Sequence, residues 1–494
     1  MSEEVEAFFE PTFNRSVKLR ARDHRLSSDG GVLLLREADE RLGLIDSLVS
    51  TLYDPRRPDR IRYYLDELLR ERIFPRALGY NVDDEVDLLA HDPAMRIAIW
   101  NRPGERVLDE RGASQPTQSR LTDLLSGDKR NLEAVRAALP DWVGRHVHAS
   151  GRGRAVRRGT LDIDSFPITV CGSQQGATYN GYYREKVYHP LVASFAPEGD
   201  YDSGRLGDGF VHAILRAGNV HTANGAARFI RTAIQRASGL ARSLDVRIDA
   251  GFTIGTVLDS LTDDRTRFIG RLKSNSVLQR LAAPSLHRPV GRPPAEGYEK
   301  IVELGEYQAE GWRHAQRLIL VVVDRPDPKT GQLDLIPRHF FLVTSWTSSE
   351  RSAEQLLEHY RRRGTFEDRL GELSQAISPR LSSPGFVENE VHLLLSLLAY
   401  NLLSILRGEL EGEPPSGWDI GRLQRTVLKT GVRITKAGRR LVVDIALCAL
   451  GLWNRLIERM DRWLLPSRSD RKPSRRRRWV PPPAHAFLSP VFKQ

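Results

Sequence analysis

The length, composition and charge of the chain exclude several classes of protein. Its 494 residues are 40% hydrophobic and 28% charged, which is typical of soluble globular proteins and argues against a wholly disordered chain or a membrane bundle. Two cysteines are too few for a disulfide scaffold or a cysteine-built zinc site, and 74 lysines and arginines against 63 acids (net charge +11) favour a nucleic-acid partner.

The start of the sequence and its most apolar run bear on localisation. The first residues, MSEEVEAFFEP, are acidic and lack the basic and apolar regions of a secretory signal, so we expect a cytoplasmic, nucleoid-associated protein. Residues 391–406 form the strongest apolar run, but it is interrupted by polar residues and is shorter than the about 20 residues that span a bilayer. We therefore expect a buried helix there and no membrane partner.

The first 150 residues predict a helical N-terminal region. Apolar residues recur at helical spacing through 31–52, 61–78 and 131–143, with proline and aspartate between these segments. A basic, glycine-rich stretch at 151–158 is typical of a linker.

Strands and helices alternate in residues 159–275, which is the α/β pattern. We predict four strands and one helix in this part of the chain. The strands are expected at 160–164, 187–196, 246–249 and 267–272, and the helix at 224–243.

Residues 276–349 predict a β-rich insertion, because they hold little helical period but two strong strand runs, at 317–324 and 339–344. Residues 326–331 are suited to a hairpin connection between them. The chain then becomes helical, and its last part, 466–494, is basic, rich in proline and predicted to be disordered. The predicted C-terminal helices are 352–373, 389–410, 420–428 and 440–465.

Acidic residues at strand ends and on one helix are candidates for metal-dependent phosphoryl transfer, which commonly uses two divalent ions held by carboxylates. Strand alternation places Asp162 and Asp164 on the same face, and Asp249 ends a short strand. Tyr360, Arg363 and Glu367 lie at i, i+3 and i+7, which is one stripe of an α-helix. On spacing alone, such a stripe is more often an ordinary solvated helix face with one ion pair than a catalytic site.

Several blocks of sequence, in the same order, resemble the bacterial insertion-sequence DDE transposases, and the similarity is greatest to the IS-thirteen-eighty branch of the IS-four-like group. The resemblance extends over about residues 30–450. The blocks are ERIFPRALGY (71–80), ASQPTQSRL (113–121), LDIDSFPITVCGSQQGATYNGYY (161–183), LRAGNVHTANGA (215–226), RIDAGF (247–252) and YRRRGTFEDRLGEL (360–373).

The resemblance implies a fold and a metal site. The fold is α/β, with a ribonuclease-H-like core in two parts (159–275 and 350–388), the β-strand insertion between them, and helical N- and C-terminal regions (1–150, DNA-binding, and 389–465). The implied catalytic and metal-binding triad is Asp164, Asp249 and Glu367. These residues are expected to hold two Mg²⁺ ions, with Mn²⁺ as a substitute.

The same resemblance suggests residues that contact DNA. Tyr360, Arg363 and Glu367 match the first three letters of the group's Tyr-Arg-Glu-Lys signature. The remaining candidates could instead pack in the protein, cap a helix or form part of a solvated basic surface. The full set expected at DNA is Tyr360, Arg361, Arg362, Arg363, Tyr183, Arg184, Lys186, Asn219 and His221. The motif at 290–293 (VGRP) and the basic run at 475–478 are weaker candidates.

Three departures from the family pattern leave alternatives open. The signature lysine would fall on Ser374, the residue two after Asp164 is Phe166 instead of threonine, and the signature arginine is followed by Gly364. The first metal ligand could therefore be Asp162. Whether transposition passes through a DNA hairpin is not predicted either way.

The function expected from the resemblance is cut-and-paste transposition. The partners would be double-stranded DNA (the terminal inverted repeats and the target) and further copies of the chain, in a homodimer or larger synaptic complex. A catalytically inactive, repurposed DNA-binding protein of the same fold and a nuclease that cuts without strand transfer are the alternatives.

Overall fold

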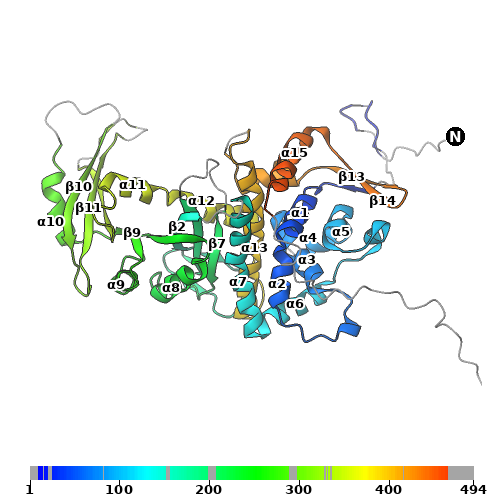
Figure 1. The fold of residues 1–494 in the computed structure, drawn as a ribbon, viewed down its shortest axis with the longest axis horizontal. Coiled ribbons are helices and arrows are strands. Elements are labelled where there is room, and N and C mark those ends of the chain that lie inside the picture. Colours follow the sequence, from blue (N-terminus) through cyan, green and yellow to red (C-terminus); the bar gives the residue numbers. More distant parts are fainter. Residues whose placement is uncertain are drawn as a thin grey trace, which may run out of the picture.

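The computed structural model describes residues 9–464 of the chain, except for residues 10, 15, 20–24, 82, 152–155, 199–206, 289–296, 327–329, 331, 334–335 and 415–416. The described part is elongated: the helical N-terminal region lies at one end, strands β10 and β11 lie at the other, and helix α13 stands between the N-terminal helices and the central sheet (Figure 1).

A mixed sheet of eight strands forms the centre of the molecule. Its first part has the spatial order β7-β6-β2-β8-β9, in which β2 pairs antiparallel with β6 and parallel with β8. Strand β6 pairs antiparallel with β7, and β8 pairs parallel with β9. The bounds are β2 (Val156–Ser165), β6 (Leu191–Glu198), β7 (Gly209–Ile214), β8 (Ala241–Ile248) and β9 (Arg267–Leu272).

The predicted β-rich insertion continues this sheet. Strand β12 (Arg338–Thr344) pairs antiparallel with β9, β11 (Gln316–Asp324) with β12, and β10 (Tyr298–Tyr307) with β11. The two predicted strand runs therefore form neighbouring antiparallel strands, as a hairpin requires, and part of the connection predicted at 326–331 lies outside the described residues. Strand β10 and helix α10 (Ser276–Ala282) were not predicted.

The structure also contains two smaller three-stranded sheets. The first has the order β3-β5-β4, and the second has the order β1-β13-β14, so that it joins the N-terminal and C-terminal regions. The bounds are β3 (Ile168–Thr169), β4 (Thr178–Asn180), β5 (Glu185–Tyr188), β1 (Arg25–Ser27), β13 (Val432–Ala437) and β14 (Arg440–Ile445).

Helices pack on the sheet and around α13 (Phe386–Leu410), which carries the predicted apolar run. This is the one helix of the described residues that is long and apolar enough to cross a membrane, and its most apolar window is completely buried inside the protein. It lies against β7, α3, α6, α7 and α15. The other helices are α1 (Val32–Leu42), α2 (Leu44–Thr51), α3 (Leu65–Ala77), α4 (Asp83–Leu89), α5 (Pro93–Ile99), α6 (Gln115–Gly127), α7 (Lys129–Ser150), α8 (Ala226–Ala237), α9 (Gly255–Asp263), α11 (Ala353–Arg361), α12 (Gly364–Glu372), α14 (Ile420–Leu423) and α15 (Leu447–Asp461).

One side chain of α13 protects the edge of the sheet. Asn401 accepts a hydrogen bond from the backbone N–H of Phe210 (2.8 Å) and donates one to the carbonyl of the same residue (2.8 Å). The amide thus takes the place of a further strand beside β7. An edge strand would otherwise expose these backbone groups.

Outside the candidate site, three predicted elements differ from the structure. The helix predicted over 440–465 is wrong in its first part, because Arg440–Ile445 forms β14, paired in register with β13, and the helix begins only at Leu447. The helix predicted at 224–243 ends at Ala237, and β8 begins at Ala241. The single strand predicted at 187–196 is two strands, β5 and β6, separated by His189 and Pro190.

Candidate active site

Asp164 and Asp249 follow neighbouring parallel strands to the same edge of the sheet. The last registered pair of β2 and β8 is Ile163 with Ile248, and each aspartate is the next residue of its chain. Adjacent strands lie about 4.8 Å apart, so the two carboxylates are neighbours. Asp249 is fixed by the turn after β8, where the N–H of Gly251 donates to its Oδ1 (2.9 Å).

Asp162 lies on the same face of β2 but is enclosed. Its carboxylate accepts two hydrogen bonds from Arg247, from Nε (2.8 Å) and from Nη2 (2.7 Å), and its exposure is 0%. Arg247 also donates to the carbonyl of His359 (2.8 Å). This bidentate pair fastens β2, β8 and α11 together and leaves Asp162 without a free face toward a ligand.

The helix predicted over 352–373 is interrupted where the candidate residues lie. Helix α11 ends at Arg361 and α12 begins at Gly364, with Arg363 as its N-cap residue. The N–H of Arg363 bonds to the carbonyl of Tyr360, three residues back, instead of four. Glycine disfavours a helix interior by about 1 kcal/mol relative to alanine, which is consistent with a break at this point. The prediction that Tyr360, Arg363 and Glu367 lie on one continuous helix is therefore wrong.

The interrupted helix nevertheless brings Arg363 and Glu367 to Asp164. Arg363 donates to Asp164 Oδ2 (2.5 Å) and to Glu367 Oε1 (2.6 Å). Arg363 is buried and Glu367 is exposed. Burial raises the pKa of Asp164 to about 6, against the effect of Arg363, and the charge of Asp249 adds to the increase. Arg363 thus joins Asp164 to Glu367, and Asp249 follows the strand next to that of Asp164.

Two tyrosines lie beside these acids. Burial raises the pKa of Tyr360 to about 12, so its phenol stays protonated at neutral pH. The pKa of Tyr183 is also raised, first by burial and then by the charges of Tyr182, Asp164 and Asp249. Both phenols are therefore neutral hydrogen-bond donors close to the carboxylates.

Helix α12 is held by a buried ion network. Arg369 contacts Asp208 (3.0 Å), and Arg407 of α13 contacts both Asp208 (2.9 Å) and Glu372 (2.7 Å). Arg407 and Asp208 are almost completely buried, so the pairing of these charges is required for them to remain inside the protein. The network fixes the position of the helix that carries Glu367.

The small sheet β3-β5-β4 and the loop 217–225 dock onto each other. Asn180 donates to the carbonyl of Gly218 (2.6 Å), and the N–H of Asn219 donates to Thr178 Oγ1 (2.8 Å). A Cβ at Gly218 would lie 2.1 Å from the carbonyl oxygen of Val187, so only glycine allows this approach. Two sequence blocks that were separate candidates are therefore one surface.

Arg216 organises this loop and was not among the predicted residues. It is buried, it donates to the carbonyls of Thr222 and Asn224 (3.0 Å each), and it has no carboxylate partner among the described residues. Burial lowers its pKa to about 10. The methyl group of Thr222 lies against Gly251, next to Asp249. The available sequence signal was its place in the block LRAGNVHTANGA (215–226), which resembles the transposases.

Among the described residues, no hydrogen bond or ion pair joins the other predicted DNA-binding residues to Asp164, Asp249 or Glu367. Arg361 pairs with Glu299 of β10, and Arg362 pairs with Glu358 (2.7 Å). Lys186 donates to the carbonyl of Gly172. Arg184, Asn219 and His221 are exposed, with Arg184 in a left-handed turn (φ 58°).

A second cluster that could hold a metal ion lies on the same face of the sheet, nearer the start of β8. It consists of Glu198, Asp245 and His359, and sequence reasoning did not find it. His359 Nδ1 lies 2.6 Å from Glu198, and Nε2 lies 2.8 Å from Asp245. Burial would lower the pKa of His359, but these two acids outweigh it and raise the pKa. In this arrangement the side chain of His359 is an imidazolium between the carboxylates of Glu198 and Asp245.

Comparison with known proteins identifies the family. A family model described as "Transposase DDE domain group 1" matches residues 9–460. The chain belongs to this family. A comparison with curated proteins found no match. The mixed α/β fold with its large mixed sheet is consistent with a DDE transposase, and membership implies a transposase that binds DNA and uses divalent metal ions.

Proposed function

We propose that this transposase binds the terminal inverted repeats of its own insertion sequence and catalyses cut-and-paste transposition. The observation that carries the proposal is the meeting of Asp164 and Asp249, at the ends of two parallel strands, with Arg363 and Glu367 from the helix break. Four residues from three distant parts of the chain converge at one edge of the sheet.

The sheet order supports a ribonuclease-H-like core. In chain order, β2, β6 and β7 form an antiparallel meander, and β8 and β9 are then added parallel on the other side of β2. This is the strand arrangement of that core, with β10–β12 as an insertion before α11 and α12. The proposed catalytic acids belong to its first strand, its fourth strand and the helix after the insertion.

Asp164 is the better choice for the first ligand. Asp162 already accepts two hydrogen bonds from Arg247 and is completely buried, whereas Asp164 is partly exposed and lies beside Asp249. Carboxylate oxygens are the ligands that Mg²⁺ prefers, and Asp164, Asp249 and Glu367 offer a suitable set. We propose two Mg²⁺ ions there, with Mn²⁺ as a substitute.

The side chains then have distinct roles. Bound divalent ions supply Lewis-acid stabilisation and activate water. Arg363 orients Asp164 and Glu367 through its two hydrogen bonds and presents positive charge to the phosphodiester. Tyr360 supports the bound DNA strand as a neutral phenol. Water attacks the phosphorus at the transposon end and the P–O3′ bond breaks, which leaves a 3′-OH on the element and a 5′-phosphate on the flanking DNA. That 3′-OH then attacks a phosphorus of the target DNA and displaces a target 3′-OH.

The finer identity follows the sequence resemblance. We place the transposase in the IS-thirteen-eighty branch of the bacterial IS-four-like group, acting at the nucleoid in the cytoplasm. Two DNA ends must be joined to the target, so a homodimer or larger synaptic complex is expected. The tyrosine and loop surface beside the acids (Tyr183, Asn219 and His221) is proposed to contact the DNA.

The test is cleavage and strand transfer on DNA that carries the element's own end. Wild-type protein, Asp164→Asn and Glu367→Gln are compared in Mg²⁺, with DNA binding measured separately by fluorescence anisotropy. Loss of a partner that only supports a metal ligand typically costs 10–100-fold, so loss of a ligand is expected to lower the cleavage rate by more than about 100-fold while binding persists.

The matched control is Arg242→Gln, an exposed residue at the opposite end of β8. It is expected to cleave like the wild type. If the wild type binds but does not cut, the protein is a repurposed DNA-binding protein. If it cuts without joining the 3′-OH to target DNA, it is a nuclease.

A further inference from the structure

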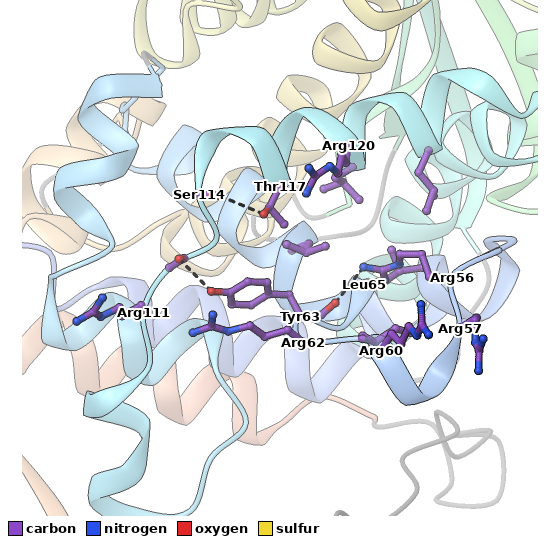
Figure 2. Close-up of a pocket in the computed structure, with 15 residues that line it drawn as sticks. Arg56, Arg57, Arg60, Arg62, Tyr63, Leu65, Arg111, Ser114, Thr117 and Arg120 are labelled. Carbon is purple, nitrogen blue, oxygen red and sulfur yellow. Dashed lines mark hydrogen bonds between the residues drawn. The ribbon is translucent and has the colours of Figure 1, made fainter.

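An arginine-lined groove lies in the N-terminal helical region, on the other side of α13 from β2 and β8 (Figures 1 and 2). Its volume is about 630 Å³. One wall is the segment between α2 and α3, and the other is the start of α6 and the residues before it. Six arginines line it: Arg56, Arg57, Arg60, Arg62, Arg111 and Arg120.

Most of this positive charge is not neutralised. Arg56 pairs with Asp54 (2.8 Å), and Arg57 pairs with Asp59 (3.0 Å), with both partners of the second pair exposed. The other four arginines are exposed and have no ion pair with any residue that the structure describes. Arginines without acids on a concave surface indicate an anionic ligand.

The unpaired arginines are spread along the groove. Figure 2 shows Arg60 at one end beside Arg56 and Arg57, Arg62 and Arg111 at the other end, and Arg120 opposite them on α6. A small anion would contact one of these ends only. A linear polyanion with charges at regular intervals can contact all of them, and guanidinium groups bind phosphates bidentately.

The two walls are cross-linked, so the groove is formed before a ligand arrives. Tyr63 donates across the groove to the carbonyl of Gly112 (3.4 Å), and within the first wall Arg56 donates to the carbonyl of Tyr63 (3.1 Å). Behind them, Glu71 accepts hydrogen bonds from the N–H of Ala113 (2.9 Å) and from Gln118 (2.6 Å). These bonds connect α3 with the start of α6.

Hydroxyl groups supplement the arginines at the start of α6. Ser114 is its N-cap residue, and its Oγ lies 3.2 Å from Thr117 Oγ1, with both residues lining the groove. Serine and threonine hydroxyls and helix N-termini are common partners of DNA phosphates, alongside arginine. The groove thus combines three kinds of phosphate-binding group.

We propose that this groove binds the sugar–phosphate backbone of double-stranded DNA at a site separate from the carboxylates. The inference rests on the proposed function, since DNA is the substrate of that function. Phosphate contacts carry no sequence information, so the groove adds affinity and sets orientation.

The test is the salt dependence of binding to a duplex of scrambled sequence. Each phosphate contact contributes about 0.9 to the slope of log K against log salt, so Arg60→Gln and Arg120→Gln together should make the slope shallower by about 2. The single variants should each change it by about 1. Arg242→Gln, an exposed arginine outside the groove, should leave the slope unchanged.

Every outcome decides the proposal. An unchanged slope in the folded double variant would overturn it, and so would tighter binding of double-stranded RNA than of the DNA duplex. Because the outer arginines are exposed, circular dichroism is expected to show wild-type folding; if it does not, the single variants decide. Cleavage is scored separately: a wild type that binds with the expected slope but never cuts would refute the catalytic proposal alone.

Discussion

Asp162 and Asp164, two residues apart on β2, are expected to respond in opposite ways to the same change from aspartate to asparagine. Asp162→Asn removes the negative charge that Arg247 needs, while Arg247 remains buried, at 3% exposure. Asp164→Asn removes a carboxylate whose pKa is raised to about 6, mainly by burial. The first change should affect stability, and the second should affect catalysis.

The expected size of the first effect follows from the burial of both partners. Breaking a buried ion pair by removing one partner costs about 3–5 kcal/mol, because the other charge is left uncompensated. For Asp164, the raised pKa means that its ionised form is unfavourable in the folded state above pH 6. Arg363, which is also buried, loses one partner in Asp164→Asn but keeps Glu367, so this change should cost clearly less free energy of unfolding at pH 8 than Asp162→Asn.

The assay is urea unfolding of wild type, Asp162→Asn, Arg247→Met and the double variant, together with Asp164→Asn. Each single change at the pair should cost several kcal/mol, and the double variant should cost less than their sum, since neither charge then remains. Cleavage is measured on the same proteins at a temperature where all are folded. Asp162→Asn should still cut DNA, and Asp164→Asn should not.

Two results would refute the reasoning. A wild-type unfolding midpoint for Asp162→Asn would show that the pair does not hold β2 to β8. Loss of cleavage in a fully folded Asp162→Asn with retained cleavage in Asp164→Asn would exchange the roles of the two acids.

Three further predictions concern the framework of the site. His359→Gln should destabilise the protein most at acidic to neutral pH: the raised pKa of His359 gives stability that is complete below its usual 6.5 and is lost as pH rises through the raised value. Burial raises the pKa of Glu198, but its contacts with His359 and Arg351 outweigh burial and lower the pKa to about 2. The stability that Glu198 contributes is complete above about pH 4.5 and is lost as the pH falls toward 2, so the stability curves of the wild type and His359→Gln should converge at both extremes of pH. Asn401→Leu should cost about 2–4 kcal/mol in urea unfolding, since it leaves the N–H and carbonyl of Phe210 unpaired; a cost below 1 kcal/mol would contradict the edge-protecting role. Leu398→Ala, at a position with 0% exposure in α13, should cost about 2–5 kcal/mol, and near-native stability would show that α13 is not the central core helix.

The strand ends of the site were predictable from the sequence, because strand alternation and a following glycine mark Asp164 and Asp249 locally. What the local pattern could not give was the partner of each acid. Asp162 and Asp164 have the same periodicity, and only the pairing of β2 with β8 puts Arg247 beside Asp162. Register between strands is set by long-range packing, which a single-sequence pattern does not contain.

In the C-terminal part, helical spacing of apolar residues predicted a helix where the structure has a strand, β14. The segment from Arg440 to Leu465 has apolar residues at helical spacing, but its first six residues alternate in exposure as β14 and pair with β13. Strand β13 in turn pairs with β1, more than 400 residues earlier in the chain. Tertiary pairing overrode the local helical preference.

The insertion has a mechanical consequence, since β12 hydrogen-bonds to β9 in the same sheet that carries the acids. A tethered module would move on a hinge and transmit no force, but a shared sheet is stiff across its strands. Arg361, the last residue of α11, is also paired to Glu299 of β10. A load applied to β10–β12, by DNA or by a second subunit, would therefore act as a lever on Asp249 and on the junction of α11 and α12. The outermost strands are the place from which the geometry of the carboxylates can be adjusted without touching them.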